Sequence, residues 1–138
     1  MKSRLLESDA DRFARCLRDA HGYHARTVQF VEEHRPASLV FNVGAIAIES
    51  YLIALCSWFK VMPTIHNFSG LLEEAEDMVA FNPELSKAIT DLDDIFGICS
   101  VENYYHGVPQ QDDADKVVFI CNELQKMLGA VSSVPAGS

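Results

Sequence analysis

The sequence lacks an uninterrupted apolar run of the roughly 20 residues that a membrane-spanning helix requires. Its opening residues, MKSRLLESDADR, carry basic side chains but not the apolar stretch of a secretory signal. These two absences argue against a membrane partner and predict a cytoplasmic protein. Alternation of apolar and polar residues with a period of two is missing as well, which argues against half-buried β-strands.

Repeats, low-complexity segments and interior linkers are also missing. The chain has 138 residues, of which 49% are hydrophobic and 22% are charged, as in an ordinary globular domain. We therefore expect a single domain over residues 1–131, followed by a disordered tail at residues 132–138.

Cysteine is scarce, and its spacing argues against the common cysteine chemistries. The four cysteines are Cys16, Cys56, Cys99 and Cys121, and no two of them form a C-x-x-C pair. Each has apolar neighbours, so in a cytosolic chain we expect buried free thiols rather than disulfides or metal ligands. No cofactor is expected.

Arginine is absent after residue 35, and the chain as a whole is acidic, with a net charge of −9. The six arginines are Arg4, Arg12, Arg15, Arg18, Arg26 and Arg35. From residue 36 onward the sequence holds four lysines against fourteen acids. Contact with phosphates needs clustered basic side chains, so general DNA binding is not expected. Any surface that attracts phosphate belongs to the first helix.

The sequence does contain helical periodicity, which is interrupted by proline and glycine residues. Helices are predicted at about residues 9–33, 38–61 and 66–80, from Pro83 onward, and from about Asp112 onward. N-caps are expected at Ser8 or Asp9, at Asn82, and at Asp112 or Asp113. Because the connections are short, neighbouring helices should be antiparallel. The predicted fold class is all-α, an up-and-down antiparallel helical bundle of four to five helices.

The predicted core faces follow from three-and-four spacing. In the first helix the stripe is Phe13, Leu17, Ala20, His24, Val28 and Val31. In the helix that begins at Pro83 it is Leu85, Ala88, Ile89, Leu92, Phe96 and Cys99. In the last helix it is Val117, Ile120, Cys121, Leu124 and Leu128. Arg12, Arg15 and Arg26 fall nearly opposite the first stripe. We expect them in solvent, with a phosphate-binding face as the alternative. The acids of the third and fourth helices, Asp93 included, are also expected in solvent.

The second predicted helix is apolar on almost every side. Its polar residues form one narrow stripe with two isoleucines; the stripe is Asn42, Ile46, Glu49, Ile53, Ser57 and Lys60. So apolar a helix must be enclosed, either by its own bundle or by another subunit. We therefore expect a homodimer that forms through apolar helix faces.

Two constellations could carry chemistry. His21 and His24 form an H-x-x-H pair on the first helix, which with Glu49 could bind a metal; a core histidine with one hydrogen bond is the simpler interpretation. In the segment ENYYHG, Glu102 and His106 are four residues apart, so in a helix the carboxylate could orient the histidine as a general base. The alternative is that this segment only shapes a loop.

Two stretches resemble the HEPN family (higher eukaryotes and prokaryotes nucleotide-binding). The family pattern A-x-E-x-x-L-K-A is matched by Ala47, Glu49, Leu52 and Ala54, and the pattern H-D-L-x-x-L-L by His66, Asn67, Phe68, Leu71 and Leu72. Ile53 replaces the family's lysine, and Asn67 replaces its aspartate. The resemblance implies a helical bundle and a dimeric habit.

The same resemblance places the family's functional motif at residues 102–107. Ribonuclease members carry an arginine several residues before a histidine, and this chain keeps His106 without that arginine. An arginine stabilises a phosphoryl transition state, whereas Glu102 would repel it. The resemblance therefore favours binding over catalysis.

The leading hypothesis is a homodimeric HEPN-like protein that binds a nucleotide, an RNA or a partner protein of toxin–antitoxin type. Its ligand-binding residues would be Asn103, Tyr104, His66 and Glu49. The alternative is a ribonuclease in which His106 is the base, Tyr105 or Tyr104 assists, Glu102 orients the histidine, and an arginine comes from another subunit. A metal-binding bundle is the third hypothesis.

Overall fold

The computed structural model describes residues 7–64, 67–95 and 109–132. Within these ranges the chain forms helices and no strands. The helices are α1 (Asp9–Glu32), α2 (Ala37–Trp58), α3 (Phe68–Glu76), α4 (Pro83–Ile95) and α5 (Gln111–Ser132). The all-α bundle is confirmed.

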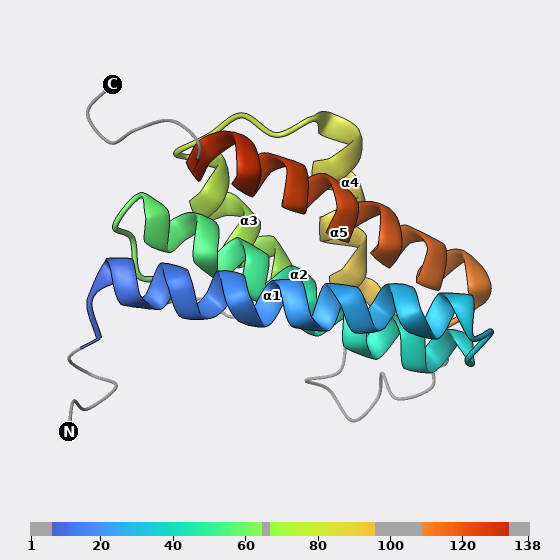
Figure 1. The fold of residues 1–138 in the computed structure, drawn as a ribbon. Helices are drawn as coiled ribbons and strands as arrows, with labels where there is room; N and C mark the ends of the chain where they lie inside the picture. The colour runs from blue at the N-terminus through green and yellow to red at the C-terminus, as the bar shows by residue number, and fades with distance from the viewer. Residues whose placement is uncertain (1–6, 65–66, 96–108, 133–138) are drawn as a thin grey trace.

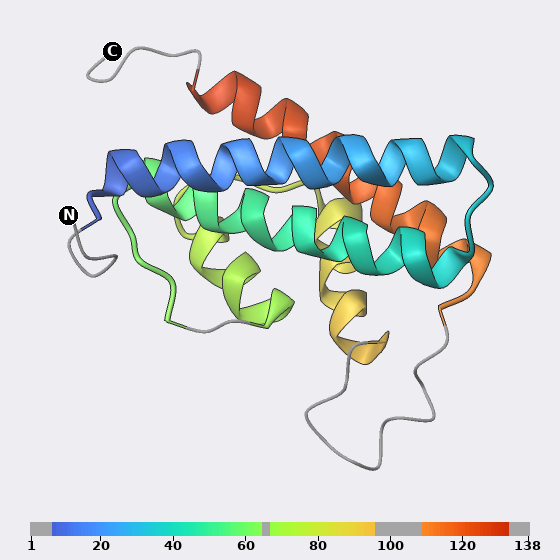
Figure 2. The same ribbon diagram turned by 60° about the horizontal axis from the view of Figure 1, so that its bottom comes forward.

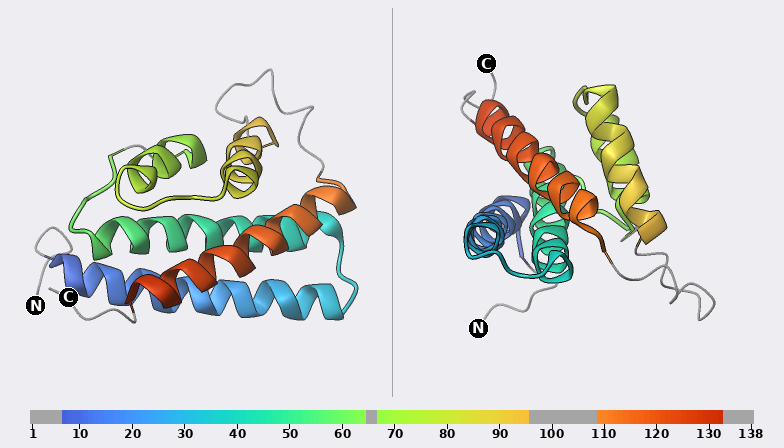
Figure 3. Two further views of the ribbon diagram at one scale, coloured as in Figure 1. Left: turned by 90° about the horizontal axis from the view of Figure 1, so that it is seen from above. Right: turned by 90° about the vertical axis from the view of Figure 1, so that its right-hand side faces the viewer.

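α2 is the central helix of the bundle. It forms a long antiparallel hairpin with α1, and α5 crosses this hairpin on one side (Figure 1). The shorter α3 and α4 pack against each other and lie beside α2, away from α1 (Figure 3). Figure 2 shows the remaining side of the α1–α2 hairpin, which no other described helix covers.

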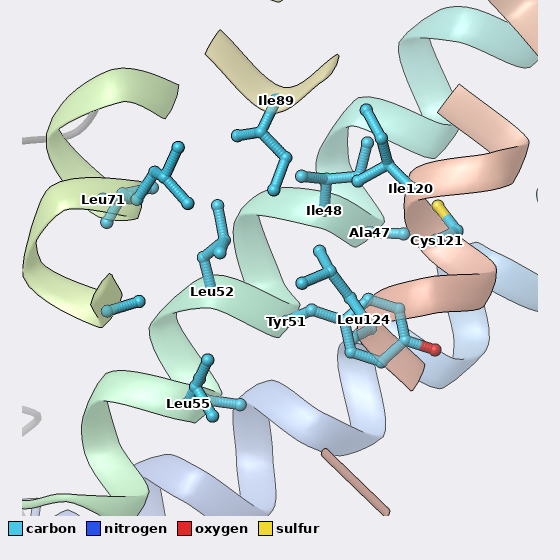
Figure 4. Close-up of a cluster of buried hydrophobic side chains, with 14 of the residues drawn as sticks. Ala47, Ile48, Tyr51, Leu52, Leu55, Leu71, Ile89, Ile120, Cys121 and Leu124 are labelled. Carbon is cyan, nitrogen blue, oxygen red and sulfur yellow. The ribbon is translucent and has the colours of Figure 1, made fainter. Parts of the chain in front are cut away.

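The core forms on both sides of α2. Leu52 points toward Leu71 of α3, whereas Ala47 lies beside Cys121 of α5 (Figure 4). The predicted stripes of α4 and α5 are buried, apart from Phe96 and Cys99, which lie outside the described residues. Of the cysteines, Cys16, Cys56 and Cys121 are buried free thiols, as predicted.

α2 is long and apolar enough to cross a membrane by length and composition alone. However, 61% of its most apolar window is buried inside the bundle, and the core helix of a soluble protein passes the same test.

The predicted N-caps at Ser8 and Asn82 are confirmed, and Asn67 caps α3 as well. The Ser8 hydroxyl accepts a hydrogen bond from the Asp11 backbone N–H at 3.0 Å. The side-chain oxygens of Asn67 and Asn82 accept from the N–H groups of Gly70 and Glu84, each at 2.7 Å. These oxygens satisfy backbone donors that have no partner within the first helical turn. The predicted cap at Asp112 or Asp113 is wrong, because α5 begins at Gln111 and these acids lie in its first turn, where the Asp113 carboxylate accepts from the Gln110 N–H at 2.9 Å.

Two helices end earlier than predicted. α3 stops at Glu76 rather than near residue 80, and α2 stops at Trp58 rather than near residue 61. After α2, Lys60 adopts a left-handed conformation with φ of 65°, and the Val61 N–H bonds the Cys56 carbonyl at 2.9 Å. This arrangement is a Schellman motif, which turns the chain away from the helix axis.

The face of α1 is rotated relative to the predicted stripe. Val28 and Val31 are exposed, whereas Arg12, Cys16 and Thr27 are buried beside Ala20 and His24. The prediction that Arg12 is in solvent is therefore wrong. Its guanidinium is buried because polar groups of α2 and of the segment after α2 accept its hydrogen bonds.

Candidate functional site

Of the predicted catalytic and ligand-binding residues, Glu49 alone lies within the described ranges, and the candidate metal ligands His21 and His24 are described as well. His66 lies outside these ranges, as do Glu102, Asn103, Tyr104, Tyr105 and His106, so the proposed catalytic segment has no structural account here. Glu49 is half-buried on α2, three residues after the exposed Ile46 and four before the half-buried Ile53, so it lies on the least buried stripe of this helix.

Glu49 lines a pocket of about 270 Å³ between α1 and α2. The pocket residues are Arg12, Arg15, Cys16 and Asp19 of α1, Glu49, Ser50 and Ile53 of α2, and Met62 and Pro63 from the segment after α2. Sequence reasoning missed this pocket, because it depends on how the two helices are paired.

Arg12 is committed to structural contacts at one end of the pocket. Its Nε donates to Ser57 Oγ at 2.8 Å, and an Nη atom donates to Asp9 Oδ1 at 2.5 Å and to the Val61 carbonyl at 3.5 Å. Only 7% of Arg12 is exposed. Arg12 therefore joins the start of α1 to the end of α2 and is not available to a ligand.

Arg15 is also neutralised within the chain. It donates two hydrogen bonds to the Glu7 carboxylate, at 2.9 and 3.0 Å. These hydrogen bonds hold the pKa of Arg15 above its ordinary value. Because Arg12 and Arg15 already face carboxylates, the phosphate-binding alternative keeps only Arg26 of its three arginines.

The remaining charges of the pocket are acidic. Asp19 lies 3.9 Å from the exposed Arg18, a weak contact, and Glu49 makes no hydrogen bond or ion pair within the described part of the chain. Asp9 and Glu7 balance Arg12 and Arg15, so the pocket carries a net negative charge. A free phosphate group would be repelled there.

The pocket has one thiol, Cys16, which is not activated. Burial raises the pKa of Cys16, and nearby Arg15 offsets this only in part. A nucleophilic cysteine needs a depressed pKa and access to solvent. The pocket is therefore better suited to binding another molecule than to covalent catalysis through Cys16.

His24 is buried and belongs to a hydrogen-bonded network that joins α1, α2 and α5. Its Nδ1 lies 2.7 Å from Tyr51 Oη, and its Nε2 lies 2.9 Å from Asn122 Oδ1. Because the amide oxygen only accepts, a neutral His24 carries its hydrogen on Nε2 and accepts from the tyrosine hydroxyl at Nδ1. Burial raises the pKa of Tyr51, which keeps this hydroxyl a donor.

This network opposes the metal hypothesis. Both ring nitrogens of His24 have partners, and His21 packs its ring edge-on against Tyr51 at 5.9 Å. Among the residues that the structure describes, no three His, Cys, Asp or Glu side chains gather to hold a metal ion. His24 is a core histidine, as expected, with two hydrogen bonds rather than one.

Asp93 corrects another expectation, since it is not simply in solvent. Its two carboxylate oxygens accept from the backbone N–H groups of Phe68 and Ser69, at 3.0 and 2.8 Å. A carboxylate at this position also complements the positive end of the α3 dipole. Asp93 thus fastens α4 to the start of α3.

Comparisons with protein families, with curated proteins and with solved structures found no match.

Proposed function

We propose that this protein acts by binding other molecules rather than by catalysis, as a HEPN-like helical homodimer. The observation that carries the proposal is that one side of the α1–α2 hairpin is covered by no other described helix (Figure 2), while Ile46 is 44% exposed on α2, the most apolar helix of the bundle. An apolar side chain presented in this way is typical of a contact surface.

The burial pattern is compatible with the family resemblance. Ala47, Leu52 and Ala54 are fully buried, whereas Glu49 of the same motif is half-buried at the pocket. Asn67 caps α3, and aspartate would cap a helix equally well, so the change from the family's aspartate conserves the physical role. These motif positions therefore help to form the helical bundle, and they do not by themselves indicate a catalytic role.

Among the three partner classes, the charges favour a protein of antitoxin type over a nucleotide or an RNA. The chain carries a net charge of −9, and the pocket arginines are paired with carboxylates. Nucleic-acid contact requires basic groups that are free to meet phosphates.

Light scattering coupled to size-exclusion chromatography tests the dimer at micromolar concentration. We expect a mass of about twice 15.4 kDa. A monomer across the accessible concentration range would overturn the homodimer.

Incubation of the purified protein with mixed RNA tests the absence of catalysis. We expect no cleavage above that of a His106→Ala variant prepared in parallel. Cleavage by the native protein that the variant loses would instead establish the ribonuclease alternative.

A further inference from the structure

The uncovered side of the hairpin combines residues from both helices; we call it the hairpin face. On α1, Tyr23 lies seven residues after the pocket residue Cys16, and Arg26 lies seven after Asp19. Seven residues are close to two helical turns, so these side chains continue the line of the pocket. On α2, Ile46 lies seven residues before Ile53 for the same reason.

Apolar side chains are exposed along this face. Ile46 is 44% exposed, Tyr23 is 40% exposed, and Leu39, one further heptad back along α2, is 36% exposed. They come from two adjacent helices, so the face carries several exposed apolar side chains rather than a single one.

The hairpin face also carries one free charge of each sign. Four of the five described arginines have a carboxylate within 4 Å. The pairs are Arg12 with Asp9, Arg15 with Glu7, Arg18 with Asp19, and Arg35 with Glu33. Arg26 and Glu49 make no ion pair and no hydrogen bond within the described residues. Arg26 projects from α1, and Glu49 projects from α2.

This distribution of charge is self-complementary. A two-fold axis that lies in the plane of contact, midway between Arg26 and Glu49 and perpendicular to the line that joins them, brings α1 of one copy onto α2 of the other. It then sets each Arg26 opposite the Glu49 of the second copy, so two ion pairs form from one kind of contact. Contact surfaces of two-fold dimers have this isologous arrangement.

We propose that the hairpin face binds a second copy of this chain, with Arg26 of each copy paired to Glu49 of the other across a two-fold axis. The inference rests on the proposed homodimer and assigns its contact surface and register. Tyr23 and Ile46 lie between the two ion pairs and supply the apolar centre, and the paired charges form the rim.

Charge reversal at both positions tests the assignment. In the Arg26→Glu variant, the new glutamate of each copy faces Glu49 of the other copy. In the Glu49→Arg variant, the new arginine of each copy faces Arg26 of the other copy. Each single variant therefore places two pairs of like charges across the interface. We expect the dimer dissociation constant, measured by sedimentation, to rise by more than about tenfold in each. The double variant restores opposite charges, and we expect its dissociation constant within about threefold of the native value.

Arg18→Glu is the matched control. Arg18 also lies on α1, but 75% of its side chain is exposed away from the pocket line, so the same charge change should leave the dimer intact. Circular dichroism and thermal unfolding of every variant establish that the fold is retained. Ile46→Arg, at an exposed position that cannot disturb the core, provides a second test and should also yield monomers.

The outcomes separate the two proposals. A native protein that is monomeric overturns both the homodimer and its contact surface. A native dimer that neither single reversal nor Ile46→Arg weakens overturns the hairpin face alone, because the dimer then forms elsewhere. Weakened single variants that the double variant fails to rescue overturn the pairing of Arg26 with Glu49.

Discussion

At the scale of single residues, two side chains occupy backbone conformations that favour glycine. His34 follows α1 with φ of 56°, and Lys60 follows α2 with φ of 65°. At the end of α1 the Arg35 N–H bonds the Phe30 carbonyl at 2.9 Å, which repeats the Schellman pattern seen at Lys60. Neither position carries the glycine that usually marks a helix end, so the sequence did not reveal where α2 stops.

These conformations predict stabilising substitutions. In His34→Gly and Lys60→Gly, glycine removes the clash between Cβ and the backbone, and we expect each variant to gain about 1 kcal/mol in free energy of unfolding. Urea denaturation measures the change. Glu32→Gly, within the last turn of α1, is the control and should lose stability, because glycine there only loosens a helix.

Arg12 shows how a charged residue can belong to the core. Arg12→Ala removes the hydrogen bonds to Ser57 and Asp9 and leaves a void between α1 and α2, so we expect a loss of about 2–3 kcal/mol in free energy of unfolding. Arg18→Ala, at a mostly exposed side chain, should change stability by less than about 0.5 kcal/mol. Equal effects of the two substitutions in urea denaturation would contradict the burial of Arg12.

At the scale of elements, Gly44 sets the approach of α1, α2 and α5. A Cβ atom at this position would lie 2.0 Å from Val117 Cγ1 of α5 and 3.3 Å from Thr27 Cγ2 of α1. Cys121 Sγ also approaches the Gly44 carbonyl at 3.5 Å. Three helices therefore meet where the side chain is smallest.

Gly44→Ala should lower the free energy of unfolding by about 1–3 kcal/mol, since the branched Val117 side chain has little freedom to withdraw. Gly22→Ala and Gly129→Ala are matched controls, because both positions are helical and open. Those variants should gain about 0.5–1 kcal/mol through helix propensity alone. A stable Gly44→Ala variant would show that the helices can separate at this point.

At the scale of the whole molecule, burial controls the chemistry of the thiols. It raises the pKa of Cys56 to about 11 and that of Cys121 to about 12. Because the thiolate is the reactive form, these groups are protonated at neutral pH and become reactive only as pH rises toward those values.

Thiol labelling followed by peptide mass spectrometry measures this protection. Near pH 8 we expect Cys16, Cys56 and Cys121 to react more than about tenfold slower in the folded protein than in urea. Rapid labelling of Cys121 without denaturant would show that α5 separates from α2 in solution.

The sequence by itself determined what depends on local chemistry and periodicity. Ser8 and Asn82 cap helices because a side-chain oxygen next to a helix start has free N–H groups to bind. The α5 stripe is buried because its spacing matches the helical turn. It also identified Glu49, through the motif resemblance, as a residue worth locating.

Only the tertiary structure decided which sides of α2 are covered. Because α2 is apolar almost all round, its own periodicity does not distinguish a buried side from an exposed one. The packing of α1, α3 and α5 makes that choice and leaves Ile46 exposed and Glu49 half-buried. The same packing buries Arg12, since its partners come from residues 45 and 49 positions away in the chain. Contacts over such distances are properties of the fold and not of any local pattern.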